Sequence, residues 1–165
     1  MKKQIIVING TGECGKDSFV KCVQKYEKTF NFSSIDGVRR VAREAGWDGG
    51  KTEKDRKFLC DLKKLTTEYN DFAFNYITKA VKEFRESDNS IMFIHIREPE
   101  EIERAVKAFD AKSLLIKRKG QENIKSNPSD ANVDNYDYDF IVHNDGTLEE
   151  LEVKAKDFVE KLNKE

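Results

Sequence analysis

Short apolar runs alternate with longer charged stretches along the chain, and this alternation predicts strands that alternate with helices. Ile5–Ile8 is apolar at every position, as expected of a strand buried on both faces. The runs expected to form strands are Ile5–Ile8, Thr29–Ser33, Ser90–Ile96, Ala111–Lys117 and Tyr138–His143. The stretches expected to be helical are Lys16 to about Lys28, Ser34–Gly46, Lys51 to about Thr67, about Asn70 to Glu86, Pro99 to about Phe109, and the segment after Thr147.

Local signals refine these elements. Phe58, Leu59, Leu62 and Leu65 recur at helical spacing, so they are expected to face inward from a charged amphipathic helix. Thr147 is followed three residues later by Glu150, which predicts a capping box at the start of the last helix. The polar stretch from 120 to 137 predicts a loop or flap.

Strands that alternate with helices indicate an α/β fold, with a central parallel sheet of about five strands and helices on both faces. Ligands bind such sheets at the carboxyl ends of the strands. The segment that follows Ile5–Ile8 is therefore a candidate site.

That segment is glycine-rich and runs from Gly10 to Ser18, where a helix is expected to open at Lys16. Its spacing, G-x-x-x-x-G-K between a strand and a helix, is typical of a phosphate-binding P-loop, so the fold is expected to be the three-layer P-loop NTPase fold. The alternative is a glycine-rich turn without a ligand. The residues expected to contact a nucleotide there are Gly10, Thr11, Gly12, Glu13, Cys14, Gly15, Lys16, Asp17 and Ser18.

The position after Lys16 departs from the usual motif, because it holds Asp17 rather than Ser or Thr, and Ser18 comes one place later. Asp17 and Ser18 are the candidate Mg²⁺ ligands. No run of four hydrophobic residues ends in Asp, so a second carboxylate for the metal is not evident.

Composition indicates which classes of partner and which compartment to expect. The 165 residues carry a formal net charge of −1, which gives no basic excess for nucleic acid or an anionic membrane. The odd number of cysteines, Cys14, Cys22 and Cys60, lacks the spacing of a zinc site or a disulfide framework and favours a reducing compartment. With no apolar segment of membrane length evident, a cytoplasmic enzyme is the simplest expectation.

Phosphoryl transfer depends on positive charge around the migrating group, so arginines at strand ends are candidates. Arg97 is expected to hold an acceptor phosphate, and the alternative is a surface salt bridge. Arg118 is expected to act as a lid arginine, with a solvated charge cluster as the alternative. Further acceptor-binding candidates are Ser34, Asp36, Arg39 and Arg56, although the charged run around Arg56 is typical of a solvated helix face and Asp36 could simply complement a helix dipole.

Several segments together resemble the P-loop kinases that phosphorylate small phosphorylated acceptors, above all phage-type deoxynucleoside monophosphate kinases and animal-type phosphomevalonate kinases. The segments are Gly12–Ser18, which matches their S-G-K-D form with Cys14 in place of Ser and Glu13 before it, Phe32–Arg39, Phe93–Ile102 and Asn135–Leu151. The resemblance implies the nucleoside monophosphate kinase fold, ATP with Mg²⁺ as donor, and transfer of the γ-phosphoryl group. It also implies that Lys16 holds donor phosphates, that Arg97 contacts the acceptor, that Arg118 stands at the lid, and that Asn144, Asp145 and Gly146 line the adenine.

We therefore expect a single kinase domain over residues 1–165, with an acceptor-binding helical region at about 34–86 and a lid-like loop at about 117–137. The expected partners are ATP and a small phosphorylated acceptor, most simply a (deoxy)nucleoside monophosphate. The alternatives are a kinase for another phosphorylated metabolite and an ATP-binding protein with weak or no transfer activity, which would act as a sensor or a partner-binding module. The oligomeric state cannot be read from the sequence.

Overall fold

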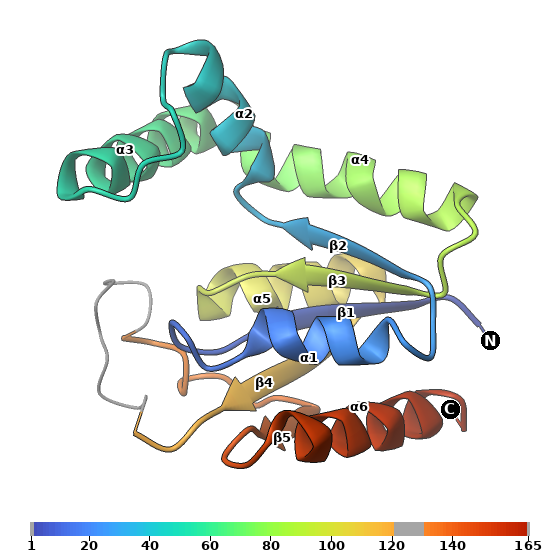
Figure 1. Ribbon diagram of the computed structural model, residues 1–165. Helices are drawn as coiled ribbons and strands as arrows, with labels where there is room; N and C mark the ends of the chain where they lie inside the picture. The colour runs from blue at the N-terminus through green and yellow to red at the C-terminus, as the bar shows by residue number, and fades with distance from the viewer. Residues whose placement is uncertain (1, 121–130, 165) are drawn as a thin grey trace. The chain divides into compact units, whose positions relative to one another are not determined.

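The computed structural model describes residues 2–120 and 131–164, drawn in colour in Figure 1. The strands are β1 (Gln4–Asn9), β2 (Thr29–Ser33), β3 (Ile91–His95), β4 (Lys112–Lys117) and β5 (Phe140–His143). The helices are α1 (Lys16–Val23), α2 (Asp36–Glu44), α3 (Glu53–Asn70), α4 (Phe72–Glu86), α5 (Pro99–Phe109) and α6 (Leu148–Leu162). Strands and helices alternate along much of the chain, as the sequence pattern predicts, but α2, α3 and α4 follow one another, and β5 is the next described element after β4.

The chain divides into two compact units. The first comprises residues 1–31 and 84–165, and the second comprises residues 32–83. The second unit covers nearly the same residues as the helical region expected at about 34–86. The expectation of a single domain with an acceptor-binding region stays a prediction.

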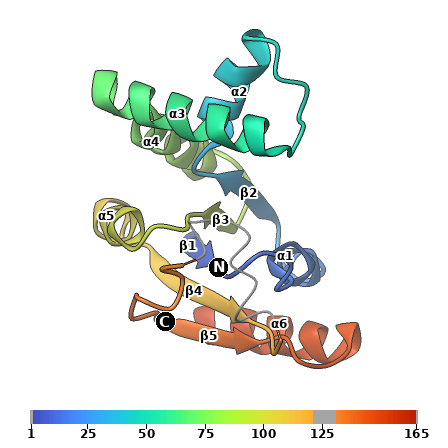
Figure 2. The ribbon, with the colours of Figure 1, turned by 90° about the vertical axis from the view of Figure 1, so that its left-hand side faces the viewer.

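The strands form one sheet in the order β2-β3-β1-β4-β5. The pairs β1–β3, β1–β4 and β4–β5 are parallel, and Val7 of β1 lies opposite Ile94 on one side and Ser113 on the other. The central position of β1 is visible in Figure 2. The expected α/β fold with a five-stranded parallel sheet is confirmed.

Helices cover both faces of this sheet in the first unit. Ile6 and Ile8 of β1 belong to a buried cluster with residues of α1 and α6, and the edge-to-face rings of Phe19 and Phe158 lie 5.6 Å apart within it. On the opposite face α5 packs on β1 and β4 (Figure 2). Burial from both sides explains why β1 is apolar from Ile5 to Ile8.

Two helices differ from the sequence expectation. Helix α1 ends at Val23, five residues before the expected end, because Lys25 and Tyr26 donate to carbonyls only three residues back and close a turn. Helix α3 has no buried residue, and Phe58 and Leu65 are exposed rather than inward-facing. Its start is fixed by a capping box between Thr52 and Asp55, which sequence analysis missed.

The capping box expected at α6 is confirmed. The Thr147 hydroxyl accepts from the backbone N–H of Glu150 at 3.3 Å, and the Glu150 carboxylate accepts from the N–H of Thr147 at 2.9 Å. Two of the free donors at the start of the helix are thereby satisfied.

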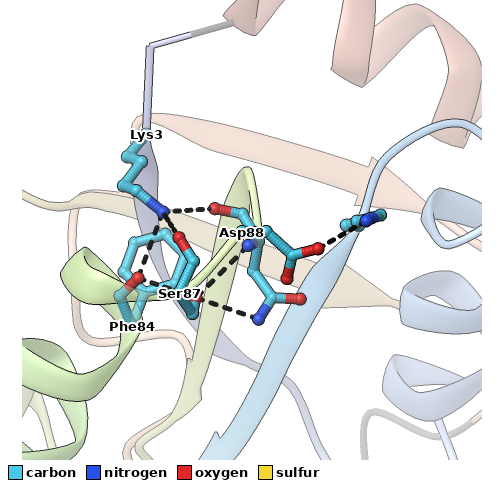
Figure 3. A network of polar contacts seen from close by, with 6 residues as sticks. Lys3, Phe84, Ser87 and Asp88 are labelled. Atoms are coloured by element: carbon cyan, nitrogen blue, oxygen red, sulfur yellow. Dashed lines mark hydrogen bonds and ion pairs between the residues drawn. The ribbon is translucent and has the colours of Figure 1, made fainter.

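Lys3 closes the turn that follows α4, as Figure 3 shows. Its ammonium donates to the backbone carbonyls of Phe84, Ser87 and Asn89 at 3.2, 2.5 and 2.8 Å. It also lies 4.9 Å from the centre of the Phe84 ring. One side chain before β1 therefore ties together three backbone carbonyls at the end of α4 and in the turn after it.

Candidate active site

The loop between β1 and α1 needs glycine at both ends. Gly10 has φ 151° and Gly15 has φ 96°, which L side chains rarely adopt. A Cβ on Gly10 would lie 2.5 Å from both the Cys14 sulfur and the Ile116 carbonyl oxygen. A Cβ on Gly15 would lie 2.2 Å from the side-chain nitrogen of Asn144. The glycines of the predicted motif are thus required by the packing of the loop itself.

Lys16 is the first residue of α1, and its side chain folds back over the loop. Its Nζ donates to the carbonyls of Gly10 and Thr11 at 2.5 and 2.9 Å and lies 3.8 Å from the Cys14 sulfur. Gly15, the N-cap residue of α1, offers no side chain to the N–H groups of the first turn. The start of the helix can therefore direct these N–H groups and the positive end of its dipole at an anion.

Glu13, the acidic residue that stands before Cys14 in the loop, is exposed and has φ 59°. Water screens a charge at such a position. The left-handed conformation of a non-glycine residue is uncommon and marks the tight turn that the loop makes here.

Asp17 and Ser18, the predicted metal ligands, are both exposed in the first turn of α1. Within residues 2–120 and 131–164, no group of three or more His, Cys, Asp or Glu side chains is arranged to hold a metal. Mg²⁺ usually binds through one or two carboxylates together with substrate phosphates, so a carboxylate and a hydroxyl beside the loop suit that mode. The part that these two residues play in metal binding stays a prediction.

Cys14 is fully buried beneath the loop. Burial raises the pKa of its thiol, and the nearby Lys16 ammonium only partly offsets this. A raised pKa lowers the fraction of the reactive thiolate at neutral pH.

Two of the predicted arginines lie beyond the ends of the strands that flank β1. Arg97 follows β3 by two residues and is half-buried, and Arg118 comes directly after β4 and is exposed. Parallel strands end at the same edge, so the backbone at both positions borders the edge that carries the loop.

A shallow recess lies next to Arg118. It is lined by Thr11, Leu115, Ile116, Lys117, Arg118, Val133 and Asp134. The Lys117 ammonium and the Asp134 carboxylate form an ion pair at 2.8 Å on its wall. The remainder of the lid-like loop, residues 121–130, lies outside the described residues.

The turn after β5 supports the loop. Asn144 is buried, and its amide donates to the carbonyl of Cys14 at 3.0 Å. The carboxylate of Asp145 accepts from the backbone N–H of Lys119 at 2.7 Å. The family resemblance implies that Asn144, Asp145 and Gly146 line the adenine, and this stays a prediction. The brace from Asn144 to the loop is an additional role that the sequence did not reveal.

The second unit holds the other acceptor candidates. The Asp36 carboxylate accepts from the backbone N–H of Ser33 at 2.8 Å and pairs with Arg39 at 3.2 Å, as a residue that stabilises the start of α2 would do. Ser34 is buried, and Arg56 is exposed near the start of α3. The part of these residues in acceptor binding stays a prediction.

Neither Asn9 nor Tyr138 was expected from the sequence to take part in the site. Asn9 is the buried last residue of β1, and its side chain hydrogen-bonds to Gly10, Arg97 and Tyr138. The available signal was a polar residue that ends an apolar run, since a buried amide needs partners. Those partners lie up to 129 residues away in sequence, beyond the reach of any local pattern.

Comparison with known proteins supports the fold and leaves the family open. No protein-family model matches the chain, and no curated protein matches it. Among solved structures, TT1252 from Thermus thermophilus has a TM-score of 0.60 at 14% identity, covering 98% of this chain and 99% of that one.

Two other solved structures are similar over nearly the whole chain. The Deinococcus radiodurans tunicamycin resistance protein has a TM-score of 0.54 at 10% identity, with 96% of each chain covered. A candidate kinase from Chloroflexus aurantiacus has a TM-score of 0.54 at 11% identity, covering 99% of this chain and 97% of that one.

The chain has a kinase-like P-loop fold. At these identities the likeness concerns the fold alone, and the finer resemblance to deoxynucleoside monophosphate or phosphomevalonate kinases stays a prediction. None of the helices described here is both long and apolar enough to span a membrane.

Proposed function

We propose that this chain is an ATP-dependent phosphotransferase that moves the γ-phosphoryl group to a small phosphorylated acceptor, a (deoxy)nucleoside monophosphate. The observation that carries the proposal is the loop from Gly10 to Lys16, which presents an uncapped helix start at the centre of a parallel sheet. The arginines beyond β3 and β4 on either side of β1 support transfer rather than binding alone.

The residues take the following roles. ATP supplies the γ-phosphoryl group, whose bond to the bridging β–γ oxygen breaks as the bond to an acceptor phosphate oxygen forms, leaving ADP. Lys16 exchanges the carbonyls of Gly10 and Thr11 for phosphate oxygens, and the loop N–H groups hold the remaining phosphate charge. Asp17 and Ser18 would hold Mg²⁺ beside these phosphates.

Arg97 binds the acceptor phosphate, and Arg118 neutralises charge that develops on the transferring group. These fixed positive charges contribute most once water is excluded from the site. Ser34, Asp36, Arg39 and Arg56 provide further acceptor contacts, and Asn144–Gly146 contact the adenine. The proposed setting is the reducing cytoplasm, because Cys14, Cys22 and Cys60 are free thiols.

A second function is favoured by one observation. Asp17 and Ser18 are exposed, and the described residues offer no group of three metal-binding side chains. An ATP-binding sensor without transfer would need no complete metal site. The first proposal is preferred because such a sensor has no use for arginines at both flanking strand ends.

The deciding experiment is a coupled assay of ADP release with ATP, Mg²⁺ and a panel of ribo- and deoxynucleoside monophosphates, followed by other phosphorylated metabolites. Lys16→Ala should abolish acceptor-dependent release, and Lys21→Ala on the exposed face of α1 is the matched control. Release from the wild-type chain that no acceptor raises above the ATP-only background, despite ATP binding, would falsify the transfer proposal and leave the sensor.

A further inference from the structure

One buried amide connects three parts of the proposed site. Asn9 is 1% exposed at the end of β1. Its Oδ1 accepts from the backbone N–H of Gly10 at 2.8 Å. Its Nδ2 donates to the backbone carbonyl of Arg97 at 3.1 Å and to the Tyr138 hydroxyl at 2.9 Å.

The chemistry of the partners fixes the orientation of this amide. The Arg97 carbonyl can only accept and the Gly10 N–H can only donate, so a flipped amide would face each with a group of the wrong kind. Asn9 therefore has a single orientation in which its polar atoms are satisfied.

Tyr138 holds the amide from the other side. Its hydroxyl accepts from Asn9 and donates to the carbonyl of Val133 at 2.7 Å, so it anchors the segment before β5 beneath the loop. Burial raises the pKa of this phenol to about 12, so the hydroxyl remains a donor across the physiological range. The ring packs edge-on against Tyr136 at 5.1 Å.

These contacts meet at the Gly10 peptide. Its N–H is held by Asn9, and its carbonyl accepts from Lys16, the residue proposed to reach the donor phosphates. The same amide holds the backbone of Arg97, the residue proposed to bind the acceptor. In-line transfer depends on the relative position of donor and acceptor, and small displacements reduce its rate strongly.

We propose that Asn9 and Tyr138 are positioning residues, which fix the Gly10 peptide of the phosphate-binding loop relative to the backbone that carries Arg97. This inference rests on the proposed function for its kinetic consequence. Its structural part, a hydrogen-bonded Gly10 N–H that depends on Tyr138, stands apart from any activity.

The test variant is Tyr138→Phe, which keeps the ring packing and removes only the hydroxyl. The matched control is Ser113→Ala. Ser113 is also buried, and it also ties a sheet strand to the segment before β5 through Asp139, with its hydroxyl donating at 2.8 Å, but these contacts involve neither Gly10 nor Arg97. A purely structural role predicts the same behaviour for both variants.

Two measurements are made on the full chain. Amide hydrogen exchange at Gly10, without ligand, should be about tenfold faster in Tyr138→Phe and unchanged in Ser113→Ala, since one lost hydrogen bond corresponds to a factor of this order. In the transfer assay, kcat should fall about tenfold in Tyr138→Phe, with a change in KM for ATP of less than about threefold, because transfer depends more on alignment than binding does.

Unchanged Gly10 exchange in Tyr138→Phe overturns the proposal whatever the activity. So does faster exchange accompanied by a kcat equal to that of Ser113→Ala. If the wild-type chain transfers no phosphate, the proposed function fails by itself, and the Gly10 exchange rate alone decides the structural part of the proposal. Faster Gly10 exchange in Tyr138→Phe than in Ser113→Ala then supports the positioning role, and equal exchange overturns it.

Discussion

The side-chain amide of Asn144 donates to the backbone carbonyl of Cys14 at 3.0 Å, so the turn after β5 braces the middle of the phosphate-binding loop. The same amide nitrogen lies only 2.2 Å from the position that a Cβ on Gly15 would take. The fit of the loop against Asn144 and its backbone conformation at Gly15 are thus two parts of one arrangement.

This arrangement makes Gly15→Ala a sharp test. The substitution adds a clash and forces a side chain to φ 96°, which together should destabilise the chain by about 2–3 kcal/mol and weaken ATP binding. Urea unfolding measures the first effect and calorimetric titration the second. In an Asn144→Ala background the clash disappears, so the further loss from Gly15→Ala should shrink by about 1 kcal/mol or more. Additive losses would show that the two residues do not interact.

Lys16→Ala should separate stability from activity. The Lys16 ammonium bonds to two loop carbonyls in a half-buried position, so its loss should change the free energy of unfolding by about 1 kcal/mol or less. The substitution also removes the positive charge that Lys16 is proposed to place beside the transferring phosphate, which should lower kcat by about a hundredfold or more. Thermal unfolding and the ADP-release assay give the two values. A kcat within threefold of wild type would remove Lys16 from the proposed machinery.

Tyr138 should give the chain a defined loss of stability in alkali. Its pKa is about 12 in the folded chain against 10.0 for an ordinary tyrosine, so the folded state binds the proton more tightly. The resulting stabilisation is complete below pH 10 and is lost as the pH rises from about 10 to 12, with a maximum of roughly 2–3 kcal/mol. Denaturant unfolding at pH 8 and pH 11.5 should therefore show a larger drop for wild type than for Tyr138→Phe. Equal drops would contradict the assignment.

Cysteine labelling should distinguish the thiols by burial. Cys60 is exposed on α3, whereas Cys14 and Cys22 are buried, and burial raises the pKa of both buried thiols. Iodoacetamide should therefore modify Cys60 in the native chain and leave the other two unmodified. Peptide mass spectrometry locates the label, and a Cys60→Ser chain should remain unlabelled until it is denatured. Rapid native labelling of Cys14 would show that the loop opens.

The local parts of this structure could be predicted from the sequence. The apolar run of β1, the glycines of the loop and the capping box at Thr147 each depend on residues within a few positions of one another. These signals were enough to place the sheet, the loop and the arginines beyond β3 and β4. They were enough because a parallel α/β sheet brings its strand ends to one edge.

The parts that sequence analysis missed depend on distant partners. Asn9 and Tyr138, or Asn144 and Cys14, are far apart in the chain and meet only after the sheet has formed. The error in α3 has a different origin. The apolar spacing that includes Phe58 and Leu65 is typical of a helix with a buried face, yet both side chains are exposed. Periodicity indicates which residues share a face of the helix, but it carries no information on whether another element packs on that face.

The turn after α4 has a chemical consequence for the amine of Lys3. An ammonium has three N–H donors, and here the carbonyls of Phe84, Ser87 and Asn89 accept from it. Acylating reagents and acetyltransferases must reach the amine nitrogen, which these three carbonyls surround. Lys3 should therefore resist acylation while the turn is closed, unlike the exposed lysines of α1 and α6, and its acetylation would record an earlier opening of this turn.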